Sequence, residues 1–169
     1  VREIIGKELL KMKEIGRNNG YFNIGKGNTG FFNKGTDNVG DNNDGLNNYG
    51  KENIGCFNNG SFNSGSVNAG YKNYGRDNEG DANYGANNLG YYNRGNRNKG
   101  YANIGNGNIG RGNVGEENNG FSNDGEYNIG EFNSGSNNIG VLCTDENKSK
   151  LYIFNKESNI TLKQWHDHP

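Results

Sequence analysis

A period of five residues runs through most of this chain. Every fifth residue from Asn18 to Asn138 is Asn, 25 times in succession, and a Gly stands two residues after each, from Gly20 to Gly140. The motif is Asn-x-Gly-x-x. A fixed short period of this kind is typical of a solenoid, in which each coil covers its neighbours and stability is a sum of nearest-neighbour terms.

The three x positions accept side chains of every kind. The position between Asn and Gly holds Ile24, Lys34 and Asp44, and the position before Asn holds Phe32 and Glu52. A buried position would not tolerate such variety, because an unpaired buried charge costs several kcal/mol. Asn and Gly stand two apart, so in extended backbone they point to the same side. We therefore expect the variable positions to face water and the constant ones to face inward.

An interior made of Asn and Gly has no apolar side chains to pack, so hydrogen bonds must hold it together. If coils stack about 4.8 Å apart, each carboxamide lies above another and the amides form a hydrogen-bonded ladder; alternatively, each Asn bonds the backbone at a turn. Gly permits a positive φ or a close backbone approach at a corner. The ladder residues that we name are Asn18, Asn23, Asn28, Asn33, Asn53, Asn73, Asn93, Asn113 and Asn138. The turn glycines that we name are Gly20, Gly25, Gly30, Gly75 and Gly140.

Composition agrees with this interior and excludes several classes of protein. Leu, Ile, Val and Phe together number 31 of 169 residues, too few for a bulk apolar core, and the formal net charge is −1. The single Pro excludes collagen, two Cys cannot make a disulfide framework, and there is no apolar run of 18 residues to span a membrane. No signal segment is visible, so we expect a cytoplasmic protein or a surface or virion component.

The repeat resembles the pentapeptide-repeat family, and its Asn-x-Gly-x-x form is similar to the tandem repeats of mycobacterial PPE proteins and of other bacterial chains. The resemblance implies an all-β solenoid, a right-handed quadrilateral β-helix with four repeats per coil. Twenty-five repeats would then make about six coils and a rod of about 30 Å; three repeats per coil would give about eight coils and about 40 Å. The variable positions barely separate these choices, and we favour four on the family resemblance.

The segments that flank the repeat differ from it in composition. Residues 1–16 predict an amphipathic helix over about 2–14, with Ile5, Leu9 and Met12 on one stripe, and residues 17–141 form the solenoid. In residues 142–169 we expect a strand over 150–154 and a short helix that docks through Leu162 and Trp165. Both ends are interpreted as caps over open solenoid edges; the alternative for the N-terminal helix is binding a partner or oligomerisation.

No set of side chains in the sequence indicates catalysis. His166 and His168 flank a single residue near the end of the chain, Cys56 has no His or Cys near it, and the acidic residues are irregularly spaced. Glycine pairs arise from the repeat itself and are no nucleotide-binding fingerprint. We expect no enzyme activity, no metal and no cofactor.

Exposed aromatic side chains are the most interesting surface feature. They either lie flat over neighbouring coils or form a contact surface for a partner; the candidates are Phe31, Phe32, Phe57, Phe62, Tyr91 and Tyr92. The leading hypothesis is a non-catalytic scaffold, a stiff rod that binds a protein or surface partner or associates with itself through its ends. The alternative is DNA mimicry toward DNA gyrase or topoisomerase. Residues 17–141 carry 10 Lys and Arg against 12 Asp and Glu, which disfavours that alternative and nucleic-acid binding. Ice binding is weaker still, since only four Thr occur.

Overall fold

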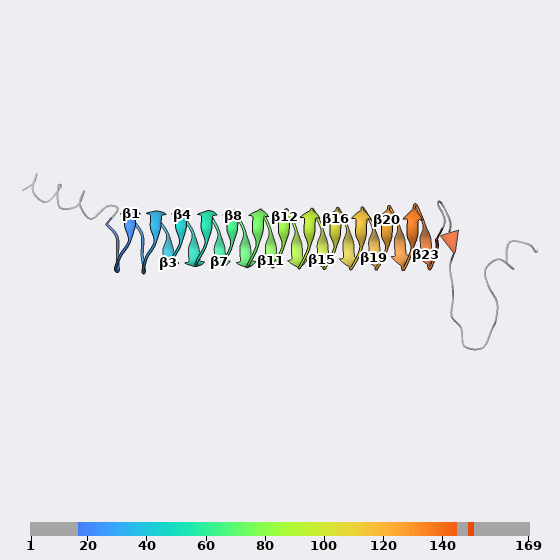
Figure 1. The fold of residues 1–169 in the computed structure, drawn as a ribbon, viewed down its shortest axis with the longest axis horizontal. Helices are drawn as coiled ribbons and strands as arrows, with labels where there is room; N and C mark the ends of the chain where they lie inside the picture. Colours follow the sequence, from blue (N-terminus) through green and yellow to red (C-terminus); the bar gives the residue numbers. More distant parts are fainter. Residues whose placement is uncertain (1–16, 145–148, 151–169) are drawn as a thin grey trace, which may run out of the picture. The chain divides into compact units, whose positions relative to one another are not determined.

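The computed structural model describes residues 17–144, 149 and 150. It divides into two compact units, separated between Asn87 and Asn88. Each unit is a β-solenoid built from short parallel strands, of three residues each except the two-residue β24, and the described residues form no helix (Figure 1).

The described residues of the first unit, 17–87, form twelve strands in two parallel sheets. One sheet has the order β1-β2-β4-β6-β8-β10-β12 and the other has the order β3-β5-β7-β9-β11. The strands of the first sheet are β1 (Ile24–Lys26), β2 (Lys34–Thr36), β4 (Asp44–Leu46), β6 (Ile54–Cys56), β8 (Ser64–Ser66), β10 (Tyr74–Arg76) and β12 (Tyr84–Ala86). Those of the second are β3 (Val39–Asp41), β5 (Tyr49–Lys51), β7 (Asn59–Ser61), β9 (Ala69–Tyr71) and β11 (Glu79–Asp81).

The second unit repeats this arrangement. One sheet has the order β14-β16-β18-β20-β22, and the other runs from β13 through the odd-numbered strands to β23 and β24. The strands of the first sheet are β14 (Arg94–Asn96), β16 (Ile104–Asn106), β18 (Val114–Glu116), β20 (Asp124–Glu126) and β22 (Ser134–Ser136). Those of the second are β13 (Leu89–Tyr91), β15 (Lys99–Tyr101), β17 (Ile109–Arg111), β19 (Asn119–Phe121), β21 (Ile129–Glu131), β23 (Ile139–Val141) and β24 (Ser149–Lys150).

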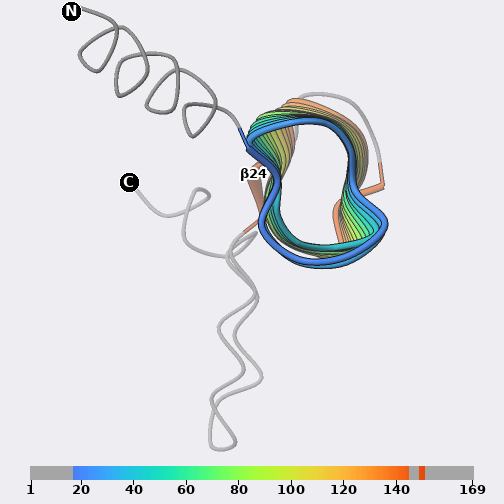
Figure 2. The same ribbon diagram turned by 90° about the vertical axis from the view of Figure 1, so that its left-hand side faces the viewer.

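The register shows how each repeat maps onto the coil. Ile24 pairs with Lys34 and Ile104 pairs with Val114, so residues ten apart lie directly above one another. We number the repeat positions from Asn as position 1. Positions 2 to 4 form the strand with Gly at its centre, and position 5 and the next Asn form the corner that leads to the opposite sheet (Figure 2).

A coil therefore contains two repeats, and the expectations of four or three repeats per coil are wrong. The reason is the size of the inward side chain. A carboxamide is short, and each one reaches carbonyl groups in repeats on both sides of it, so the two sheets stand one Asn side chain apart. The central Gly acts in another direction, because a Cβ there would meet the Gly carbonyl of the next coil in the same sheet. Residues 17–87 make about seven coils, which extend about 34 Å at 4.8 Å per coil.

Several predictions for the flanking segments lie outside the described residues. These are the helix over 2–14 with Ile5, Leu9 and Met12, and the docking of Leu162 and Trp165. Of the strand expected over 150–154, only Lys150 is described, where it belongs to β24 and pairs with Gly140. The repeat conformation itself continues through Cys143, which takes the place of the next Asn and whose N–H donates to Asn133 Oδ1 at 3.0 Å.

Candidate functional surface on an asparagine ladder

Each interior Asn binds to its neighbours in the same way, and Asn38 is representative. The Oδ1 of Asn28, one coil earlier, accepts hydrogen bonds from Asn38 N–H at 3.0 Å and from Asn38 Nδ2 at 3.1 Å. The same Nδ2 donates to the carbonyl oxygens of Lys34 at 3.2 Å and Gly45 at 2.9 Å. The side chain thus links one coil to the next and one sheet to the other.

This bonding is nearly uniform along each unit, and it confirms the predicted asparagine ladder. The ladder asparagines from Asn28 to Asn138 are at most 1% exposed, whereas Asn18 and Asn23, in the first described coil, are half-buried. Among the described residues, no buried side-chain nitrogen or oxygen lacks a hydrogen-bond partner. Cys143 is the one buried residue of that part of the chain that is not Asn. The interior therefore consists of carboxamides, and its polar groups are satisfied.

The central glycines are required by close approach of the backbone. A Cβ added to Gly75 would overlap the carbonyl oxygen of Gly85 in the next coil, and Gly75 has φ +120°. The inference of a positive φ and a close approach is therefore correct. The placement at turns is wrong, because Gly25, Gly75 and Gly140 lie at strand centres and Gly20 and Gly30 directly follow isolated bridge residues.

The true corner is position 5, which sequence reasoning missed. Twenty-two residues other than Gly have a positive φ there, between 50° and 60°, including Val67 and Phe32. Such a conformation is rare for these side chains. The N–H groups of most corner residues donate to the preceding coil, as when Phe32 N–H donates to the Tyr21 carbonyl at 3.1 Å. Stacking imposes the corner, and the sequence carries only a weak sign of it: Gly27, Gly107 and Gly112, the glycines of the repeat that lie outside position 3, all stand at position 5 and have a positive φ.

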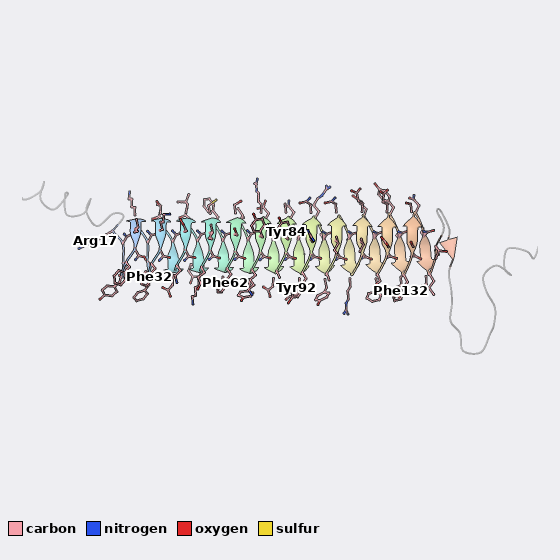
Figure 3. All side chains as sticks on the ribbon, in the orientation of Figure 1. Arg17, Phe32, Phe62, Tyr84, Tyr92 and Phe132 are labelled. Carbon is pink, nitrogen blue, oxygen red and sulfur yellow. The ribbon has the colours of Figure 1, made fainter. Side chains whose placement is uncertain are left out.

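The candidate aromatic residues are exposed, and the ten-residue coil groups them into columns. The exposed fractions run from 41% for Phe62 to 60% for Tyr92. In the first unit Phe32 and Phe62 lie at the corners that follow the β3 sheet, as Figure 3 shows, whereas Phe57 lies at the opposite corners. Stacked ring pairs, Tyr21 with Phe31 at 5.9 Å and Phe22 with Phe32 at 4.9 Å, follow the same spacing of ten.

In the second unit, aromatic side chains at positions 4 and 5 of successive coils flank a cation. Tyr92 contacts Tyr101 edge-on, with ring centroids 5.6 Å apart. The Arg111 guanidinium carbon lies 5.2 Å from the Tyr101 ring centroid and 5.9 Å from that of Phe121. Phe121 in turn contacts Phe132 edge-on at 5.0 Å. We call these five residues the aromatic–arginine stack. Sequence reasoning selected only Tyr92 among them as a partner candidate, although the spacing 101, 111, 121 was visible.

The remaining groups considered for chemistry in the sequence are the acidic residues, Cys56 and the two His. Asp41 Oδ1 accepts the Phe31 N–H at 3.0 Å, and Asp44 forms an exposed ion pair with Lys34 at 3.4 Å, of a kind that contributes little. Cys56 is a half-buried free thiol. In residues 17–144, 149 and 150 no three metal-ligating side chains come together, and no helix is long and apolar enough to cross a membrane. His166 and His168 lie outside the described residues.

Comparison with known proteins identifies the repeat. The family model described as pentapeptide repeats (8 copies) matches residues 17–56 and 77–116. No curated protein matches the chain.

Proposed function

We propose that this chain, which belongs to the pentapeptide-repeat family, is a non-catalytic scaffold that binds a protein partner through the exposed aromatic side chains at its corners and at the strand ends beside them. Those aromatic side chains are the observation that carries the proposal. The interior is complete without them, because it consists of carboxamides whose polar groups are satisfied. They are therefore available for contacts outside the chain.

The kind of side chain favours a protein partner. Tyr92 is 60% exposed, Phe32 is 56% exposed and Tyr91 is 51% exposed. Exposed Tyr, Phe and Arg are enriched where proteins bind one another, because large rings bury much area and lose little conformational freedom on binding. A ladder-bonded solenoid would also hold these rings at fixed spacing, which lowers the entropy that binding costs.

The described charges do not support the alternative of DNA mimicry. Duplex DNA carries one negative charge per about 1.7 Å of its axis. Residues 88–144 carry five acidic and four basic side chains, and residues 17–87 carry seven and six. We expect the intact protein at micromolar concentration to leave gyrase supercoiling of plasmid DNA unchanged. Inhibition in that assay would favour DNA mimicry over the scaffold.

The scaffold is tested by site-specific photo-crosslinking in the native cell. A photoreactive phenylalanine analogue at Tyr92, on a corner, should give a discrete crosslinked product, and its mass distinguishes a second copy of the chain from another protein. The matched control is Tyr49, which is 62% exposed at position 2 of the repeat, the first residue of β5. Equal yields from both positions, or no product from Tyr92, would count against the corner as a binding surface.

A further inference from the structure

The Arg111 guanidinium is held between two aromatic rings. Its carbon lies 5.2 Å from the Tyr101 centroid and 5.9 Å from the Phe121 centroid. Both rings come from position 4 of neighbouring coils, one on each side of Arg111 along the same sheet. Cation–π contacts on both sides restrict the side chain, so its planar fork of N–H groups is oriented before any ligand binds.

No carboxylate of the described chain neutralises this guanidinium. The ion pairs between described residues all lie within residues 34–77, and none includes Arg111. The nearest acidic residue in its own column is Glu131, two coils away, or about 9.6 Å along the axis. Arg111 is exposed and carries an uncompensated positive charge in an aromatic setting.

The corner beside Arg111 is open to a ligand. Position 5 of three successive coils holds Ala102, Gly112 and Ser122, so only small side chains stand next to the guanidinium. The fold does not require Gly112, since 22 other residues adopt its corner conformation, and an added Cβ would meet only Ser122 Oγ at 3.4 Å. Larger rings flank this opening, Tyr92 on one side and Phe132 on the other, as the labelled side chains in Figure 3 show.

We propose that the aromatic–arginine stack binds the carboxylate of an Asp or Glu in an extended segment of a partner protein, with apolar neighbours of that residue covering Tyr92 and Phe132. The carboxylate accepts two N–H bonds from the Arg111 fork, the geometry that a guanidinium favours. Tyr92 and Phe132 are four coils apart, about 19 Å, which an extended peptide of about six residues spans at 3.3 Å per residue.

A phosphate or a sugar chain fits this site less well. A single Arg supplies one positive charge for a dianionic phosphate, and Glu131 in the same column opposes a second negative charge. The Tyr101 and Phe121 rings already have Arg111 on one side and an edge-on ring on the other, so they offer little free face to a pyranose. The proposal rests on the scaffold function and specifies the partner's chemistry.

The test is a titration of the full chain, labelled with ¹⁵N, with a defined probe peptide. The peptide is acetyl-Thr-Phe-Thr-Asp-Thr-Phe-amide, in which Asp and both Phe share one face of the extended chain, and its control has Asn in place of Asp. We expect saturable shifts of the Gly112 backbone amide and the Arg111 Nε–H. The Asn peptide should bind about tenfold more weakly or worse, because the charge is lost while the shape is kept. Sodium acetate at equal concentration should also bind more weakly, because it lacks the apolar flanks.

Two variants distinguish binding through Arg111 from attraction to positive charge elsewhere on the surface. Arg111→Gln should lose Asp-peptide binding, and Arg94→Gln, which removes another exposed charge of the same unit, should retain it. The proposal is overturned if Asp and Asn peptides bind equally, if acetate binds as tightly as the peptide, if Arg111→Gln retains binding, or if Gly112 does not shift. If crosslinking from Tyr92 persists in Arg111→Gln, the role of Arg111 is rejected but the scaffold function is not. No crosslinking from Tyr92 at all would reject the scaffold.

Discussion

Replacing one interior carboxamide should destabilise the solenoid far more than replacing its exposed neighbour. Asn73 Nδ2 donates to the Gly80 carbonyl at 2.6 Å and to the Ala69 carbonyl at 3.2 Å. Its Oδ1 accepts from Asn83 N–H at 3.0 Å and from Asn83 Nδ2 at 3.1 Å. Asn73→Leu removes all four hydrogen bonds while roughly conserving side-chain size.

The magnitude follows from the two buried backbone groups that lose these bonds. The Gly80 carbonyl loses its donor and the Asn83 N–H loses its acceptor, and each such loss costs about 1–3 kcal/mol. We therefore expect Asn73→Leu to lower the free energy of unfolding by about 2–6 kcal/mol. A tetrahedral branch does not fit a site shaped for a planar amide, so apolar burial offsets little of this.

Lys72→Leu is the matched control, one residue away. Lys72 keeps its backbone bond to the Ser61 carbonyl at 3.0 Å and loses only a cation–π contact with Tyr71, worth about 0.5–1 kcal/mol at an exposed site. Urea denaturation followed by circular dichroism compares the two variants. Equal midpoints and slopes for Asn73→Leu and Lys72→Leu would refute the reasoning that the carboxamide holds adjacent coils together.

Three further predictions concern the backbone. Val67 has φ 57°, unfavourable for a β-branched residue, so Val67→Asn should raise the thermal midpoint, by about 1 kcal/mol of stability; an unchanged or lower midpoint would argue against strain at position 5. Gly75→Ala should destabilise by more than about 3 kcal/mol, because its Cβ would overlap a backbone carbonyl, whereas Gly112→Ala should destabilise by only about 1–2 kcal/mol, the cost of a left-handed φ for a residue other than Gly. Comparable losses in urea melts would show that close approach is not what selects the central Gly. Asn106 precedes a Gly whose N–H donates to the Asn96 carbonyl at 2.9 Å, so this N–H is not free to attack the side chain. Mass spectrometry should find slower deamidation at Asn106 in the folded protein than after unfolding in urea, and equal rates would contradict a rigid coil.

The inward face of the repeat could be predicted from the sequence because two positions never vary while the others vary freely. Asn38 and Gly45 are constant for different reasons, a hydrogen-bonded amide and a close backbone approach, and both reasons follow from elementary chemistry. The sequence left open whether each Asn bonds another Asn or the backbone. Both occur, since the interior Asn side chains bond backbone carbonyls in addition to their neighbours in the ladder.

The size of the coil could not be predicted in the same way. It depends on how far a carboxamide reaches, and nothing at the variable positions reports that distance; Lys34 and Asp44 face water in a coil of any size. The family resemblance favoured a wider coil of four repeats. The corner at position 5 had only a weak signal, the glycines Gly27, Gly107 and Gly112, because Phe32 and Val67 have no local preference for a positive φ and adopt it where adjacent coils hold their N–H groups.

The aromatic–arginine stack was missed as a consequence. Arg111 and Tyr101 become neighbours only when residues ten apart are stacked, and columns drawn at spacings of 15 or 20 residues separate them. The coil length therefore had to be known before this candidate site could be recognised.

Hydrogen exchange of the asparagine side chains tests the central claim most directly. In protein labelled with ¹⁵N at Asn only, the Nδ2 protons of interior residues such as Asn38 and Asn113 should exchange with deuterium as slowly as the backbone amides of the strands, because both are released only when coils separate. Exposed asparagines such as Asn42 should exchange rapidly. Fast exchange at Asn38 and Asn113 would show that carboxamides do not fill the interior of this solenoid.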